Sequence, residues 1–168
     1  MRALPVAVAA LVGTVACASL GGLEGIVQPP RFAQSAERPA ELRVLAPSTD
    51  MPVGGLGVRL WAKITNPNPF GFTLSTLKGT LFLEGSRGAT ADFPLGLALE
   101  AGQEAEVPLD LTVSFSDLSG FAGAARRAAG AEPIKYRLDG TVGVDAGRLG
   151  HGLVFGPMTL MTGELRTR

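Results

Sequence analysis

Polar and hydrophobic residues alternate with a period of two over most of this chain. Between residues 56 and 64, five apolar side chains alternate with Gly57, Arg59, Trp61 and Lys63. The same alternation recurs at 107–115 and at 134–144. Strict alternation is typical of strands that bury one face and expose the other, as in antiparallel sheets. The pattern therefore predicts an antiparallel β protein.

Four further strands are expected at 41–47, 72–84, 90–99 and 153–166, because glycine, proline and asparagine clusters separate these segments. The alternation breaks near Leu77, which predicts a bulge or bend there. About seven strands at this spacing favour an all-β fold, an antiparallel Ig- or fibronectin-III-like β-sandwich. We expect it to span residues 41–168.

One short helix is expected between the strands. Ser116 or Asp117 can cap its start, and Gly130, followed by Pro133, ends it. Its apolar stripe is narrow, which favours a lid over one end of the sandwich. The two arginines of its last turn, Arg126 and Arg127, are explained by the helix dipole.

The N-terminal residues have the features of an export signal. Arg2 is the only charged residue before Glu24, and the apolar run from Ala3 to Ala16 is too short to span a bilayer, which requires about 20 residues. It matches the apolar region of a signal peptide, which we assign to residues 1–16.

Cys17, the only cysteine, comes directly after that signal. The segment Thr14-Val15-Ala16-Cys17 resembles the lipobox of bacterial lipoproteins, in which the cysteine is acylated, although Thr14 departs from the usual aliphatic residue. Ordinary cleavage after Ala18 is the alternative. We expect lipidation of Cys17, an exported protein anchored in the cell envelope, and a flexible tether over residues 17–40. Ala18 is compatible with an outer membrane location facing the periplasm.

Charge and chemistry narrow the possible functions. The 15 basic and 15 acidic residues form no run of either sign, which argues against a nucleic-acid binder. His151 lies alone between two glycines, and no Gly-x-Ser-x-Gly nucleophile motif occurs. We therefore expect no catalytic residues, no metal site and no cofactor.

The segment Asn66-Pro67-Asn68-Pro69-Phe70 follows the strand at 56–64 directly. Each proline fixes its own φ and favours an extended conformation for the asparagine before it. The asparagine side chains can bond nearby backbone and close the turn. The segment therefore predicts a rigid corner, with Phe70 packed under the end of the sandwich.

This corner resembles that of the late embryogenesis abundant type 2 family, whose unit is the water stress and hypersensitive response (WHy) domain. Other similar segments are Leu77-Lys78-Gly79-Thr80-Leu81, Val107-Pro108-Leu109 and Tyr136 to Val142. Bacterial members often look like lipoproteins. The resemblance implies a fibronectin-III-like sandwich without catalytic residues, and a role in tolerance of desiccation, heat or freezing.

Two functions follow from these observations. The first is a protective or chaperone-like envelope lipoprotein that makes weak contacts with destabilised client proteins or membranes through the outward row Arg59, Trp61 and Lys63. Cover of Trp61 by the other sheet or by the tether is the competing interpretation. The second function is a specific protein- or lipid-binding assembly module of the envelope. We expect a monomer in either case.

Overall fold

The computed structural model describes residues 26–117, 127, 130 and 132–167. The expected signal peptide, Cys17 and most of the expected helix lie outside the described residues. No described helix is both long and apolar enough to cross a membrane. The strands are β1 (Arg31–Gln34), β2 (Glu41–Leu45), β3 (Gly55–Thr65), β4 (Phe72–Leu83), β5 (Ser86–Leu99), β6 (Glu104–Ser114), β7 (Ile134–Asp145) and β8 (Leu153–Thr167). Two 3-10 turns, η2 (Phe115–Asp117) and η3 (Gly147–Leu149), lie next to β6 and β7.

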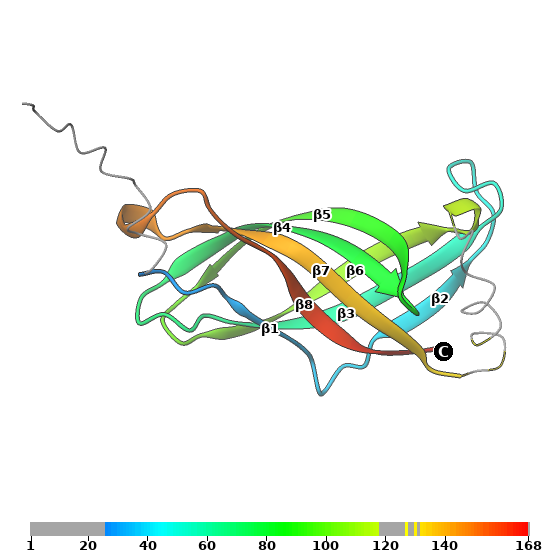
Figure 1. The fold of residues 1–168 in the computed structure, drawn as a ribbon, viewed down its shortest axis with the longest axis horizontal. Coiled ribbons are helices and arrows are strands. Elements are labelled where there is room, and N and C mark those ends of the chain that lie inside the picture. Colours follow the sequence, from blue (N-terminus) through cyan, green and yellow to red (C-terminus); the bar gives the residue numbers. More distant parts are fainter. Residues whose placement is uncertain (1–25, 118–126, 128–129, 131, 168) are drawn as a thin grey trace, which may run out of the picture.

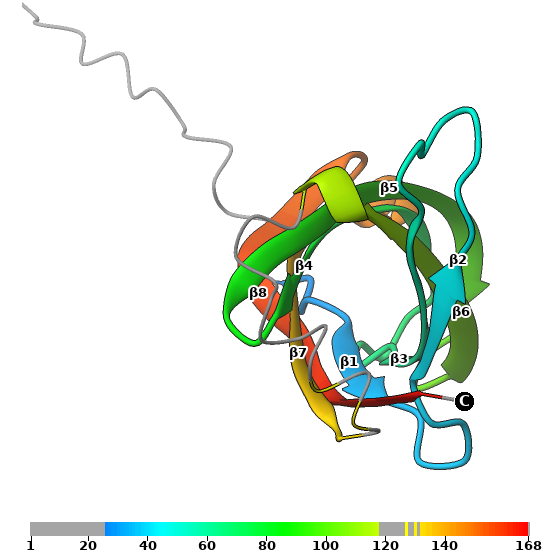
Figure 2. The ribbon, with the colours of Figure 1, turned by 90° about the vertical axis from the view of Figure 1, so that its right-hand side faces the viewer.

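The strands form two layers that curve around one core (Figure 1). In the first layer, β3 pairs with β6 on one edge, and with β1 and β2 along the two halves of its other edge. The second layer has the order β5-β4-β7-β8. All these pairings are antiparallel. A short parallel contact between β2 and β8 joins the layers, so that the strands enclose the core in the end-on view of Figure 2.

Period-two burial explains this architecture. Leu60, Ala62 and Ile64 of β3 are fully buried, whereas the residues between them are only partly covered. Leu81 and Leu138 supply equally buried side chains from the second layer. Complete burial of a leucine side chain contributes about 1.5–3 kcal/mol to folding. The β-sandwich expected from the alternation is therefore confirmed, and all seven predicted strands are present.

The N-terminal segment differs from the prediction. Residues 31–34, expected within a flexible tether over 17–40, form β1 and pair with β3. Val27 is 1% exposed and Ala40 is 4% exposed, so the folded body begins well before residue 41. The sequence offers little signal here, because a four-residue strand after Pro29 and Pro30 is too short to show a periodic pattern.

Local irregularities shape the second layer. The expected break near Leu77 is present as a register shift between Leu74 and Thr76. At the β4–β5 turn, Glu84 and Gly85 have φ values of 47° and 80°. Two successive residues with positive φ suit the tight hairpin turns that follow the twist of a sheet.

β5 and β6 are outer strands of this arrangement, as is the short β1. Each pairs along one edge only among the described strands, β5 with β4 and β6 with β3. Pro94 lies within β5 and Pro108 within β6. Proline lacks the N–H that a further strand would bond, so it is tolerated at the edges of sheets.

The close approach of β4 and β7 depends on Gly140, and we expect Gly140→Ala to be destabilising. A Cβ at this position would overlap the carbonyl oxygen of Lys78 on β4. Overpacking of this kind typically costs about 1–3 kcal/mol. Urea denaturation should show this loss, whereas Gly57→Ala, whose added carbon would have its nearest neighbour at 3.4 Å, should be nearly neutral. Equal stability of the two variants would contradict this account.

Candidate functional site

The predicted Asn66–Phe70 corner joins β3 to β4 at one end of the sandwich. Asn66 is 0% exposed and Asn68 is 2% exposed, although both are polar. Phe70 packs partly buried against the core. Burying an amide is costly unless its donors and acceptors are bonded, so the partners of these two side chains decide the stability of the corner.

The Asn66 amide links the corner to the turn between β5 and β6. Its Nδ2 donates to the carbonyl oxygens of Phe70 at 2.8 Å and Glu100 at 2.9 Å, and that of Leu99 lies at 3.2 Å. Its backbone N–H donates to the carbonyl oxygen of Gln103 at 2.9 Å. Because a side-chain amide has two N–H donors, the longer Leu99 contact shares a donor with a shorter one.

The Asn68 amide links the corner to the N-terminal segment. Its Oδ1 accepts from the backbone N–H of Gln28 at 2.7 Å, and its Nδ2 donates to the Gln28 carbonyl oxygen at 2.9 Å. Asn66 Oδ1 in turn accepts from the backbone N–H of Asn68 at 2.9 Å and from its Nδ2 at 3.1 Å. These two side chains, the amide hub, thus hold three distant segments together.

The outer face of β2, β3 and β6 carries the predicted row Arg59, Trp61 and Lys63. We call this surface the charged face, because its outward residues form ion pairs. Arg59 binds Asp110 through two hydrogen bonds of 2.6 and 3.0 Å, and Lys63 Nζ lies 2.6 Å from Glu104. The two predicted cations are therefore neutralised by carboxylates of β6.

The paired groups change each other's ionisation. Its hydrogen bond to Arg59 lowers the pKa of Asp110, and its hydrogen bond to Lys63 lowers the pKa of Glu104. The same bonds raise the pKa values of Arg59 and Lys63. All four groups are thus held in their charged forms around neutral pH.

Trp61 is partly covered by the segment that was expected to be a tether. The Arg38 guanidinium carbon lies 4.3 Å from the centre of the Trp61 ring, close enough for a cation–π contact. Ser35 fixes this segment, because its backbone N–H donates to the Trp61 carbonyl oxygen at 2.8 Å and its hydroxyl donates to Glu106 at 2.6 Å. The N-terminal segment therefore covers part of the ring and leaves the rest accessible.

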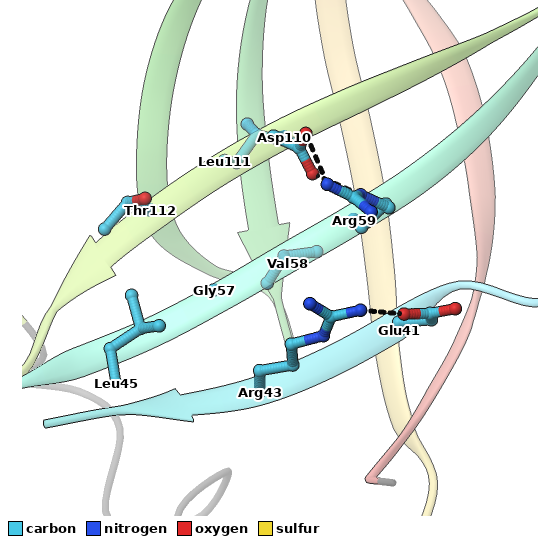
Figure 3. A pocket seen from close by; sticks show the side chains of 9 residues that line it. All are labelled: Glu41, Arg43, Leu45, Gly57, Val58, Arg59, Asp110, Leu111 and Thr112. Carbon is cyan, nitrogen blue, oxygen red and sulfur yellow. Dashed lines mark hydrogen bonds and ion pairs between the residues drawn. The ribbon is translucent and has the colours of Figure 1, made fainter.

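A small depression lies on the charged face (Figure 3). Arg59 points toward Asp110 across it, and Arg43 points along β2 toward Glu41, with which it forms an ion pair of 2.8 Å. Its volume of about 170 Å³ is below the roughly 300–1,000 Å³ of small-molecule pockets. The depression can accept a single small group, such as one side chain of a partner.

His151 lies at the exposed tip of the β7–β8 hairpin, where its Nδ1 is 2.9 Å from Asp145 Oδ1. The backbone N–H of Gly147 donates to the same carboxylate at 2.8 Å. This bond, and then the bond to His151, lowers the pKa of Asp145. The contacts thus fasten the hairpin tip to itself.

Several contributors to these surfaces were missed by sequence reasoning. These are Gln28, Ser35 and Arg38, which lie in the segment interpreted as a tether. The side-chain partners of Gln28 and Ser35 lie 40 and 71 residues away, and Arg38 contacts Trp61 on β3. The one available signal was the length of the strand at 56–64, because a long strand can pair with two short segments, here β1 and β2, along one edge. Cys17 lies outside the described residues, and its acylation stays a prediction.

Comparison with known families shows the family to which this chain is related. The LEA_2 family model, described as late embryogenesis abundant protein, matches residues 62–154, more than half of the chain. The chain belongs to this late embryogenesis abundant family. The match begins in β3 and ends in β8, so it contains the whole corner of this LEA_2 chain. The family resemblance inferred from the corner is confirmed.

Solved structures similar to this LEA_2 chain include the solution structure of AT1g01470 from Arabidopsis thaliana. It is 17% identical, the match covers 85% of each chain, and the TM-score is 0.59. A crystal structure of a protein from Archaeoglobus fulgidus is 18% identical, covering 78% of this chain and 97% of that one, with a TM-score of 0.44. The Arabidopsis likeness supports the fold alone. Curated protein sequences give no match.

The amide hub predicts a large effect of Asn66→Asp in this LEA_2 domain. A carboxylate would face the Phe70 and Glu100 carbonyl oxygens without an N–H to donate, and we expect a loss of at least about 3 kcal/mol at pH 7. Burial and the carbonyl oxygens raise the folded pKa of the new carboxyl above its unfolded value. The variant should therefore regain stability relative to wild type as the pH falls.

Gln103→Glu is the matched control, because it makes the same amide-to-carboxyl change at an exposed site. The Gln103 side chain uses its Oε1 to accept from the Glu100 backbone N–H at 2.7 Å, and a carboxylate keeps that acceptor. We expect a change within about 0.5 kcal/mol. Urea denaturation followed by Trp61 fluorescence measures both variants, and equal losses would contradict the role of the hub.

Proposed function

We propose that this protein is a non-enzymatic, lipid-anchored protein of the cell envelope that protects other proteins or membranes under stress. Membership of the late embryogenesis abundant family is the observation that carries the proposal. The family resemblance connects such domains with tolerance of desiccation, heat and freezing. Its mode of action would be weak contacts with many partners rather than a reaction.

The charged face supports weak and sequence-tolerant contact. Its ion pairs Arg59–Asp110, Lys63–Glu104 and Arg43–Glu41 combine equal numbers of both signs on a rigid sheet. Such a surface has little field to steer one particular charged partner. Exposed pairs contribute little stability individually, so either member can exchange its partner for a charge on a client protein or a lipid headgroup.

Trp61 adds an aromatic surface to the same face. Aromatic side chains supply large contact areas with little loss of conformational entropy, and the Arg38 contact holds this ring in place. A ring that is only partly covered suits transient contact with apolar groups exposed by a destabilised protein.

The carboxyl and phenol groups whose pKa values are shifted do not resemble a general acid or base. A general acid or base works best with a pKa near the working pH. Here the pKa values of Asp110, Glu104 and Asp145 are lowered, and burial raises that of Tyr136 to about 12. Each of these shifts moves the pKa of the group further from neutral pH. The described residues contain no cluster of three or more His, Cys, Asp or Glu suited to a metal ion.

A specific binding or assembly module of the envelope is the second candidate. The depression between Arg43, Arg59 and Asp110 favours it, because a hollow lined by charged groups can accept one matching side chain. Crosslinking in cells separates the two candidates. One saturable partner, lost when Arg59 is changed, would favour the module, whereas weak recovery of many proteins would favour protection.

For the protective function, we expect the protein to preserve a labile enzyme during drying or heating better than an equal mass of albumin. The double change Trp61→Ala with Arg59→Ala should reduce this protection, because it removes both the ring and one ion pair of the charged face. Phe82→Ala is the matched control, since Phe82 has an arginine, Arg137, over its ring at 4.6 Å but belongs to β4 in the other layer. Protection no better than that by albumin would refute the proposal.

For the anchor, we expect palmitate to label the wild-type chain and not Cys17→Ser. Because Cys17 is the only cysteine, loss of the label identifies the site. In cell fractionation, the Cys17→Ser chain should be absent from the membrane fraction. The Ser19→Ala chain, changed two residues away, should remain in that fraction and keep its label. Unlabelled wild-type protein would contradict the proposed anchor.

A further inference from the structure

The tether between the expected anchor and the folded body is much shorter than the sequence suggested. The body begins by residue 26 or 27, because Val27 is 1% exposed and Gln28 is bonded to Asn68. From Cys17 to Ile26 the chain has nine steps, which span at most about 30 Å in any conformation. A tether to residue 41 would have reached about 80 Å. The domain is thus held close to whatever surface carries the anchor.

One end of the sandwich receives this tether. Gln28 contacts the corner, and Pro29 lines a hollow with Leu153, Val154 and Phe155 at the start of β8. In Figure 1, the described chain begins in blue at the left end, the same end at which η3 lies in orange. We call this end of the sandwich the tether end. It comprises residues 26–30, the corner, the β7–β8 hairpin tip and the start of β8.

Exposed hydrophobic side chains concentrate at the tether end. Five large hydrophobic side chains are exposed among the described residues, and three of them lie here: Ile26 at 54%, Leu149 at 36% and Val154 at 67%. The other two are Val44 on β2 and Val53 in the loop before β3. Val53 lies at the opposite end of β3 from the corner, a strand length of about 35 Å away.

We propose that Ile26, Leu149 and Val154 seat the tether end on the lipid bilayer that carries the anchor. This inference rests on the anchored protein proposed above. The tether reaches no further than about 30 Å, so this end faces the bilayer at a high effective concentration, and a weak apolar contact suffices to hold it there.

Apolar insertion, rather than charge, is the interaction that this end offers. The charged residues of the hairpin tip include both signs: Asp145 is paired with His151, and Arg148 lies next to Leu149. Apolar side chains at a membrane surface bury about 5–10 Å into the boundary between headgroups and acyl chains. The contact is therefore expected on neutral phosphatidylcholine as well as on anionic lipid.

Seating at the tether end sets the orientation of the domain. β3 runs from the far end to the corner, so the strands would stand upright on the membrane. The charged face, which lies along β3 and β6, would then face sideways and remain accessible to clients.

The test uses the full chain with one tryptophan as a probe of lipid contact. In a Trp61→Phe background, Val154→Trp probes the tether end and Val53→Trp probes the opposite end. The chain is attached through its Cys17 thiol to a maleimide lipid in phosphatidylcholine vesicles with brominated acyl chains, so the result does not depend on acylation in cells. We expect quenching at 154 to exceed that at 53 by at least about fivefold, because only the former reaches the brominated region.

Two further variants test the named residues. Adding Ile26→Glu and Leu149→Glu to the Val154→Trp chain should reduce its quenching to the level at 53, whereas adding Val44→Glu should not. Equal quenching at 154 and 53 would overturn the proposal. A concentration-dependent blue shift at 154 without quenching would also overturn it, since it would indicate a second copy as the occupant. Palmitate labelling separately decides whether cells supply the anchor.

Discussion

Two buried amides at the corner between β3 and β4 hold one end of the sandwich together. Strand pairing cannot connect the N-terminal segment, the corner and the β5–β6 turn, because the prolines of the corner interrupt the sheet there. Asn66 and Asn68 supply side-chain hydrogen bonds that make those connections. A polar network of this kind rigidifies a structure only when every member is satisfied. Among the described residues, no buried side-chain nitrogen or oxygen lacks a partner.

The sequence predicts those parts of the fold that local periodicity encodes. The alternation at 56–64 and 134–144 identified both strands and their buried faces within about a residue, because the pattern reports burial directly. The proline corner was identified because proline restricts the backbone in any context. The amide partners Gln28 and Glu100 were not, because they lie 40 and 34 residues from the asparagines that bond them. Contacts at such separation leave no local pattern.

The interaction surfaces show the same contrast. Their local features could be predicted from the sequence, whereas their contacts with distant segments could not. The outward position of Arg59, Trp61 and Lys63 follows from their place in the alternation, but their neutralisation by β6 carboxylates depends on the register between β3 and β6. The extra strand β1 changes the interpretation most. It brings Arg38 over Trp61, and it places residues 31–34, which were expected in a tether, within the folded body. A single unrecognised strand thus alters both the chemistry of one face and the point at which the folded body begins.

The prolines of the outer strands limit the pairing of those strands with other copies of the chain. As a cell dries, every macromolecule in it becomes concentrated, and exposed strand edges become templates for fibre growth. Pro94 in β5 and Pro108 in β6 each remove a hydrogen-bond donor from a strand that would otherwise recruit another copy. The two prolines thus act against edge-to-edge pairing of copies at high protein concentration.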